Sequence, residues 1–142
     1  AFLNHRGDGR QERRWLELTY QDDADYPPAL RIDALVRIGD TWHSEPMIAG
    51  DYYRRSIRIA EVSGEETLRM RSVANLSMVA ALSGDYDTAL AMANEVLDAG
   101  RRTSDPRLTG RAYQRIAYIA CEAATGFTPE GEISMGWPLC LA

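Results

Sequence analysis

The sequence contains 142 residues, 45% of them hydrophobic and 26% charged, which is the composition of about one folded domain and excludes a wholly disordered chain. Its 16 basic residues are all arginine and stand against 21 acidic ones, and the resulting net charge of -5 argues against nucleic acid as a direct partner. No apolar run approaches the roughly 18 residues of a membrane span, so we expect no membrane partner. Cys121 and Cys140 lack the spacing of a metal site or disulfide framework, which suits a cytoplasmic protein.

Residues 1–28 are predicted to be a leader that contains one short helix. The stretch RQERRWLELTYQ, residues 10–21, carries Trp15, Leu16 and Leu18 as its apolar content. The following DDADYPP ends this helix, because proline has no amide hydrogen for a helix interior, whereas Pro28 is suited to the first turn of the next helix.

Residues 29–126 are predicted to be helical throughout, without the period-two alternation of β-strands. Apolar residues recur three and four positions apart, and Asp51 and Asp105 are suited to cap helices, the latter followed by Pro106. We expect Gly100 to end one of these helices. The predicted helices cover about residues 29–45, 51–63, 65–82, 85–100 and 105–124.

Two stretches of this region repeat each other. Gly50-Asp51 and Gly84-Asp85, each followed closely by a tyrosine, Tyr53 or Tyr86, lie roughly 34 residues apart, which is the length of one helical-hairpin repeat. Each pair follows a predicted amphipathic helix and precedes another. The repeating unit is therefore a helix, a Gly-Asp turn and a second helix, and such a hairpin buries its apolar face by stacking on a neighbour.

In this repeat the sequence resembles the tetratricopeptide repeat family. Ile38-Gly39 with Trp42 is similar to the paired residues and aromatic of the family's first helix, and GDYDTAL, residues 84–90, is the best single match to its turn. Small residues fall where the second helix of a hairpin packs closely: Ser56, Ala89 and Ala93.

The resemblance covers residues 29–126, about two and a half units, and implies an all-α fold of stacked antiparallel helical hairpins, a short α-solenoid. The distance from Gly84 to Gly126, which exceeds the family's usual repeat length, and the opening Asp-Pro-Arg-Leu at Asp105 are similar to the longer repeats of bacterial LuxR-type and ATPase-linked signal-transduction regulators. Residues 127–142 are predicted to be an irregular apolar tail, because their prolines and glycines interrupt a helix.

The resemblance also implies that the first helices of the units line a concave groove in which a peptide binds. Of the family's carboxylate clamp only Asn75 has a counterpart, which disfavours a co-chaperone that grips a peptide's terminal carboxylate. The predicted groove residues are Asp33, Asp40, His43, Arg71, Asn75, Met78, Tyr113 and Ile116.

A stripe of arginines gives a second candidate. Arg107, Arg111 and Arg115 are spaced by four and share one face of the last predicted helix. One interpretation is a solvated face paired with neighbouring carboxylates. The other is a strip that binds an acidic peptide or anionic ligand.

Catalytic motifs are scarce. The sequence has no P-loop, GxGxxG, HExxH or GxSxG motif, and we expect no metal, cofactor or catalytic residue. The remaining enzymatic alternative is a small helical enzyme using His43 with Asp40 or Glu45. Cys121 is interpreted as a small core residue. Two further motifs are interpreted as having no ligand: the acidic cluster Asp22, Asp23 and Asp25, and the RGD tripeptide at 6–8.

The sequence therefore predicts a non-catalytic module that binds a protein or peptide through the concave face of its hairpins. The alternative is an effector- or peptide-sensing domain of a larger bacterial transcription regulator, which suits a sequence that begins at Ala1 rather than Met. Because a short stack has apolar ends, we also expect capping by the tail or self-association as a homodimer.

Overall fold

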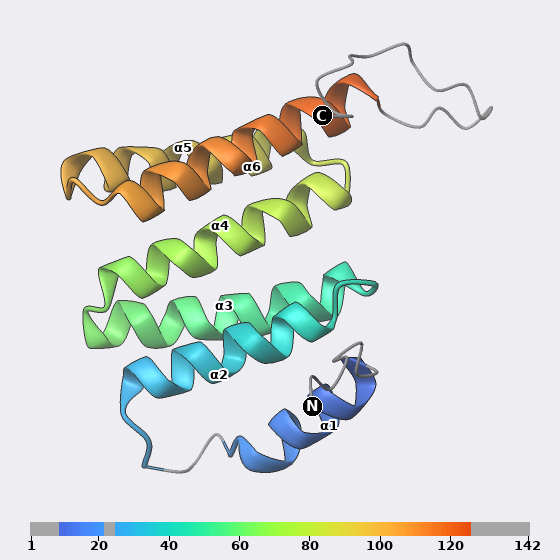
Figure 1. Ribbon diagram of the computed structural model, residues 1–142, viewed down its shortest axis with the longest axis vertical. Helices are drawn as coiled ribbons and strands as arrows, with labels where there is room; N and C mark the ends of the chain where they lie inside the picture. Colours follow the sequence, from blue (N-terminus) through green and yellow to red (C-terminus); the bar gives the residue numbers. More distant parts are fainter. Residues whose placement is uncertain (1–8, 22–24, 126–142) are drawn as a thin grey trace, which may run out of the picture. The chain divides into compact units, whose positions relative to one another are not determined.

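A computed structural model describes residues 9–21 and 25–125. These residues form six helices and no strand (Figure 1), which confirms the predicted all-α class for the described part of the chain. The predicted tail at 127–142, the RGD tripeptide, and Asp22 and Asp23 lie outside it. The helices are α1 (Gly9–Thr19), α2 (Pro28–Thr41), α3 (Pro46–Ser63), α4 (Glu66–Leu82), α5 (Tyr86–Arg102) and α6 (Pro106–Ala124).

Several helix ends follow the local signals in the sequence. Pro28 begins α2, and Gly64, in the left-handed conformation at φ 74°, ends α3. Asp105 caps α6 by accepting hydrogen bonds from the amides of Arg107 at 2.9 Å and Leu108 at 3.3 Å. These signals act within one turn of the chain, so the helix ends that they mark can be predicted without knowledge of the tertiary structure.

At two glycines the structure differs from the prediction. Gly50-Asp51 does not form a turn: α3 begins earlier, at Pro46, because proline's fixed φ suits a first helical turn. Of the two Gly-Asp copies, only Gly84 has a positive φ, 81°. Gly100 does not end α5, which continues to Arg102. The close packing of α5 against α6 explains why a glycine stands inside that helix.

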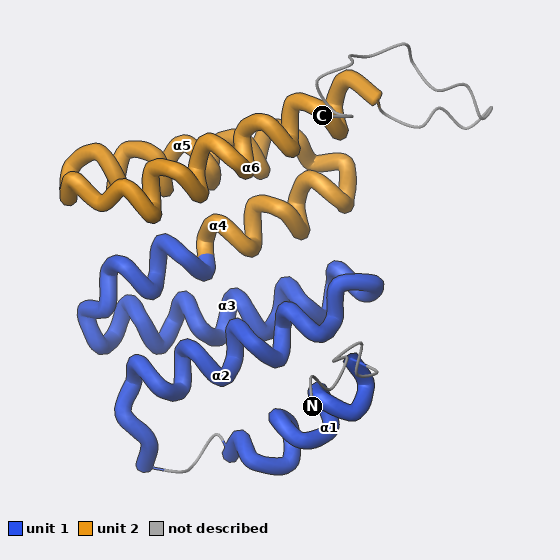
Figure 2. Tube along the Cα trace, viewed as in Figure 1, with its two compact units in different colours: residues 1–72 blue, residues 73–142 orange. Residues whose placement is uncertain are grey.

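The chain divides into two compact units, residues 1–72 and 73–142, with the boundary inside α4 (Figure 2). The first unit holds α1, α2, α3 and the start of α4, and the second holds the rest of α4 with α5 and α6.

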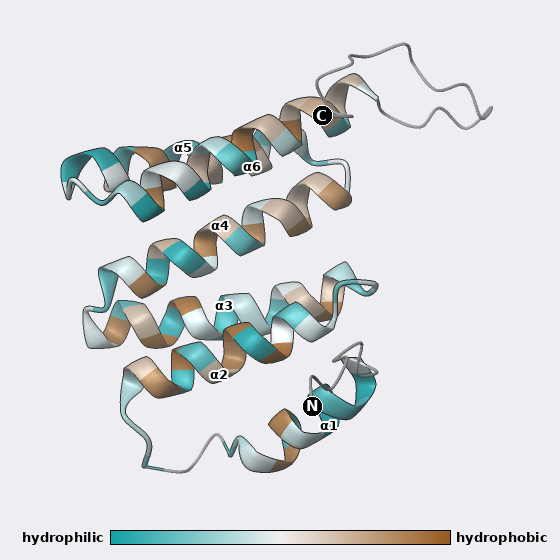
Figure 3. Ribbon diagram, viewed as in Figure 1, coloured by the Kyte–Doolittle hydropathy of each residue, from teal (hydrophilic) through white to brown (hydrophobic). Residues whose placement is uncertain are grey.

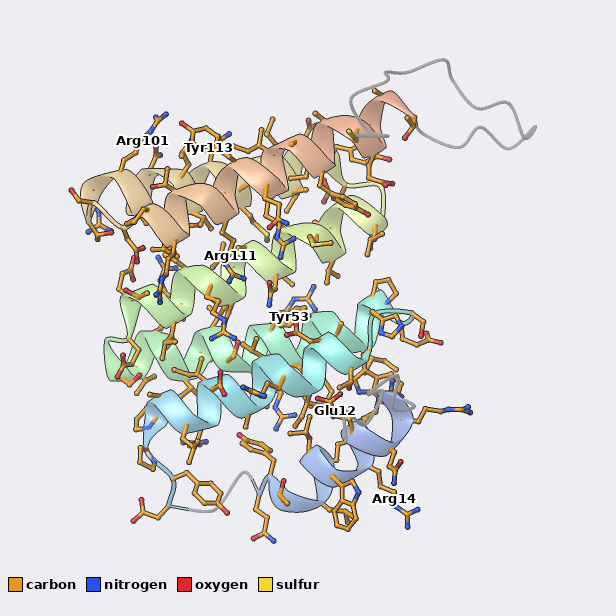
Figure 4. The ribbon with its side chains drawn as sticks, in the orientation of Figure 1. Glu12, Arg14, Tyr53, Arg101, Arg111 and Tyr113 are labelled. Carbon is orange, nitrogen blue, oxygen red and sulfur yellow. The ribbon has the colours of Figure 1, made fainter. Side chains whose placement is uncertain are left out.

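In the first unit α2 and α3 pack as an antiparallel pair around a glycine. A Cβ on Gly39 would lie 2.7 Å from the ring of Tyr53, so the ring fills the space that a side chain would need. Tyr53 is 7% exposed and lies between the two helices (Figure 4). Full burial of an aliphatic side chain contributes about 1.5–3 kcal/mol, and α2 buries four at 1% exposure or less: Ile32, Leu35, Val36 and Ile38.

Polar contacts join α3 to α4 and α1 to α2 in this unit. The hydroxyl of Ser56 donates to that of Ser72 at 2.8 Å, both side chains being fully buried. The guanidinium of Arg13 lies 3.5 Å above the ring of Trp42, and its Nε donates to Thr41 Oγ1 at 3.2 Å. Since α1 has no buried residue, these polar contacts account for much of its attachment.

The second unit is built on small residues. Ala81 of α4, Ala89 and Ala93 of α5 and Ile119 of α6 form a buried cluster. A Cβ on Gly100 would lie 2.7 Å from the backbone nitrogen of Thr109, so α5 and α6 approach at their backbones. Small side chains let the helix axes come close, which is the physical reason for the alanine content of this unit.

Cys121 of α6 is half-buried and disulfide-bonded. The interpretation of Cys121 as simply a small core residue was therefore wrong, because the spacing of cysteines along a chain does not reveal whether one of them is disulfide-bonded. None of the helices within residues 9–21 and 25–125 is long and apolar enough to cross a membrane, and Figure 3 shows hydrophilic residues along each of them.

Candidate functional site

The first unit brings together two of the predicted groove residues, Asp33 of α2 and Arg71 of α4. An Nη of Arg71 lies 3.4 Å from one carboxylate oxygen of Asp33, and Nε of Arg37 lies 3.0 Å from the other. The side chains of Asp33 and Arg71 are each 35% exposed, so the cluster is half-buried. One carboxylate thus orients two guanidinium groups, one from its own helix and one from α4.

Two other predicted groove residues of this unit do not join that cluster. Asp40 accepts a 2.7 Å hydrogen bond from the hydroxyl of Tyr53, which fixes the buried ring against Gly39. His43 is exposed in the turn at residues 42–44. The structure therefore gives Asp40 a structural contact and leaves His43 on the surface.

The second unit brings a groove residue and an arginine of the stripe together. Nη2 of Arg115 donates to the side-chain oxygen of Asn75 at 3.2 Å, which joins α6 to α4. Asn75 is 8% exposed. The stripe is not uniform: Arg107 is exposed, and Arg111 and Arg115 are half-buried. Its three arginines consequently differ in the solvent access that a ligand would need.

The other groove candidates of this unit have separate surroundings. The hydroxyl of Tyr113, a residue 50% exposed, accepts a 2.9 Å hydrogen bond from Arg101, and Figure 4 shows the two side chains together on α5 and α6. Ile116 is partly buried against the alanine cluster, and Met78 is half-buried. Tyr113 is thus the most accessible of the three.

A group of arginines on α3 of the first unit was not predicted from the sequence as a site. Arg54, Arg55 and Arg58 line an open pocket of about 410 Å³ together with Asp51 and Tyr52. The available signal was the stretch RRSIR, which places three cations within about one helical turn. The predicted groove did not include these arginines, because the family resemblance implies a groove built from the first helix of each hairpin and would make α3 a second helix.

Tyr52, in that pocket, has a raised pKa. Partial burial disfavours the phenolate, and the nearby Glu17 carboxylate, which accepts a 3.3 Å hydrogen bond from the hydroxyl, raises the pKa further. Burial and Glu122 raise the pKa of Tyr118 in the second unit in the same way. Both phenols are neutral donors at physiological pH.

Within residues 9–21 and 25–125, no three His, Cys, Asp or Glu side chains gather in an arrangement that could hold a metal ion. Comparison with known protein families finds no family that matches the chain, and no curated protein matches it either. The geometry of the two units is therefore the basis for a functional proposal.

Proposed function

We propose that the chain is a non-catalytic scaffold that binds a protein or peptide through a face of tetratricopeptide-like hairpins. The observation that carries the proposal is that two predicted groove residues make contacts across helices, one with another groove residue and one with an arginine of the stripe. Asp33 contacts Arg71 in the first unit, and Asn75 contacts Arg115 in the second, at sequence separations of 38 and 40 residues. These separations are close to one repeat length, as expected where first helices of consecutive hairpins are neighbours.

Small buried residues support the same interpretation. Ser56 on α3 and Ala89 and Ala93 on α5, which the repeat pattern predicts to be sites of close helix packing, are all 0% exposed. A bulky side chain at any of these positions would separate the helices. Recurrence of small buried residues in the second helix of each hairpin is typical of repeats that share one packing scheme.

The ordered polar pairs suit recognition of a peptide. The guanidinium of Arg71 is held by Asp33 yet remains one-third exposed, so it offers donors to an incoming carboxylate or carbonyl group. Because the side chain is already restricted, binding loses less rotamer entropy than it would with a mobile arginine, whose immobilisation costs about 0.5–1.5 kcal/mol.

A random dodecapeptide display library selected on the full chain tests this proposal. We expect recovered peptides to lose at least fivefold in affinity on Arg71→Gln. The matched control is Arg69→Gln, which removes the same charge from the same helix at a residue paired with Glu66 at 3.0 Å, and we expect an effect of less than twofold. Thermal melting of both variants verifies the fold.

Failure to recover specific peptides would contradict the proposal. So would peptides whose affinity is unchanged by substitution of Arg71, Asn75 and Tyr113.

A further inference from the structure

A row of three open pockets lies on the first unit, lined by residues other than those of the Asp33–Arg71 cluster. Their volumes are about 240, 330 and 410 Å³. Arg31 lines both the first and the second pocket, and Arg58 lines both the second and the third. The shared arginines make the pockets one continuous surface, here called the arginine pocket row.

The charge of this surface is opposite to that of the whole protein. Among the described residues, four arginines line the pocket row against one carboxylate, Asp51, whereas the chain carries a net charge of -5. Asp51 pairs with Arg54 at 3.2 Å across an exposed surface, where an ion pair contributes little. The four arginines are Arg31, Arg54, Arg55 and Arg58.

The arginines of α3 are spaced so that each is near another. Arg54 and Arg58 are four positions apart, and like charges at this spacing destabilise a helix slightly. Arg58 is exposed, and no described side chain pairs with it. An acidic ligand would relieve this repulsion, which favours an anionic occupant.

One of these arginines is oriented by aromatic rings. The guanidinium of Arg55 lies 5.4 Å from the ring centroid of Tyr52 and 6.0 Å from that of Tyr20. Cation–π contacts of this length restrict the orientation of the planar guanidinium group. A carboxylate that approaches Arg55 therefore encounters a guanidinium group whose orientation is already restricted.

The middle pocket adds an apolar requirement. Ile59, Val62 and Pro28 line it beside Arg31 and Arg58. Val62 is 92% exposed, an unusual state for an aliphatic side chain that lines a pocket. An inorganic anion would leave this apolar surface in water, whereas a peptide with an apolar side chain would cover it.

We propose that the arginine pocket row binds an acidic segment of a partner protein. Two carboxylates about one helical turn apart contact Arg58 and its neighbours Arg54 or Arg55, and an apolar side chain beside them enters the pocket of Ile59 and Val62. This surface is separate from the predicted groove residues, and either site can exist without the other.

Fluorescence anisotropy with a defined probe tests the proposal. The probe is a labelled helical peptide, about four turns long, carrying glutamates at i and i+4 and a leucine between them, and its counterpart carries glutamine at both positions. We expect the glutamate peptide to bind the full chain about tenfold more tightly, a difference of about 1.4 kcal/mol, because its carboxylates form charge-assisted hydrogen bonds.

Three variants locate the binding. We expect Arg58→Gln to weaken the glutamate peptide about tenfold and Val62→Ser about threefold. The matched control is Arg14→Gln on α1, which removes the same charge from a side chain that points away from α2 and α3 in Figure 4, and we expect less than a twofold change. The three changed side chains are exposed, so the variants are expected to keep the wild-type melting temperature.

Equal binding of the glutamate and glutamine peptides, or equal effects of Arg58→Gln and Arg14→Gln, would overturn the proposal. Tighter competition by a single-stranded oligonucleotide would assign the surface to nucleic acid instead. A dimer that dissociates on Val62→Ser, seen by light scattering without added peptide, would identify the occupant as a second copy of this chain and would likewise overturn it.

Discussion

The α2–α3 pair of the first unit and the α5–α6 pair of the second both place a helical glycine against the partner helix, but different atoms meet the glycine. A Cβ on Gly39 would meet the aromatic ring of Tyr53, a side chain that can be replaced. A Cβ on Gly100 would meet the backbone nitrogen of Thr109, which no substitution removes. Two glycines with the same role in packing therefore differ in how far a second change can compensate for their loss.

The two pairs also differ at the helix starts. In the first unit α2 and α3 begin with proline, and neither has a side-chain cap. In the second unit α5 and α6 are capped by aspartates, Asp85 and Asp105. The second unit therefore depends more on individual capping side chains.

Gly100→Ala is expected to have the largest effect, a loss of about 3 kcal/mol in the free energy of unfolding, because the new methyl group would overlap backbone. Adding Thr109→Ala removes the hydroxyl oxygen at 2.7 Å but leaves the nitrogen, and most of the loss remains. Gly110→Ala is the matched control: it has no atom within 4 Å of the new Cβ and should gain about 0.5 kcal/mol from helix propensity. Urea unfolding measures all three, and a rescue by Thr109→Ala would contradict the comparison.

Gly39→Ala is expected to lose about 2 kcal/mol because the Tyr53 ring must move from its position against α2. Combined with Tyr53→Leu, the loss should be smaller than the sum of the single losses by about 1 kcal/mol, since the double variant removes the clash. A double-mutant cycle from urea unfolding gives this coupling. Strict additivity would show that the ring and the glycine do not share one packing constraint.

Asp105→Ala is expected to lose about 1 kcal/mol because two amides at the start of α6 lose their acceptor. Glu45→Ala, at the start of α3, serves as the control: Glu45 makes no side-chain cap, and the variant should stay within about 0.5 kcal/mol of wild type. Thermal and urea unfolding separate the two. Equal losses in the free energy of unfolding would indicate that the difference in capping between the two units does not affect stability.

The smallest expected effect is a loss of stability at alkaline pH. The pKa of Tyr52 is raised in the folded state, so above the ordinary value of about 10 the unfolded chain releases the proton first and stability falls as pH rises. Tyr52→Phe should make the decline between about pH 9 and 11 shallower, as measured by urea unfolding at each pH. A decline of unchanged slope would show that burial and Glu17 do not shift this phenol.

Much of the helix pattern was predictable because its signals are local. Pro28 and Asp105 act within one turn and mark helix starts in the sequence as they do in the structure. The prediction for Gly100 was wrong because a glycine at a close approach and a glycine at a helix end look alike until the partner helix is known. The prediction for Gly50 was wrong because Pro46, earlier in the chain, had already begun the helix.

The candidate sites were predictable only in part. The separation of Asp33 and Arg71, 38 residues, suits a repeat, and the structure brings these two side chains together. The hydrogen bond between Asp40 and Tyr53 depends on which way a ring turns, and the stacking of Arg13 on Trp42 depends on where a preceding helix returns, so neither follows from periodicity. The arginines of α3 were visible as a cluster, but their shared pockets were not.

The attachment of α1 has a consequence for hydrogen exchange. A helix with no buried residue, held by Arg13 on Trp42 and by Tyr52 on Glu17, gains little from the hydrophobic effect. Opening this helix alone exposes little apolar surface, so its amides exchange through a local fluctuation rather than through global unfolding. The amides of α2, whose apolar side chains are buried, exchange only when the first unit opens as a whole. The amides of α1 and α2 are thus expected to have different hydrogen-exchange protection factors, although both helices belong to the first unit.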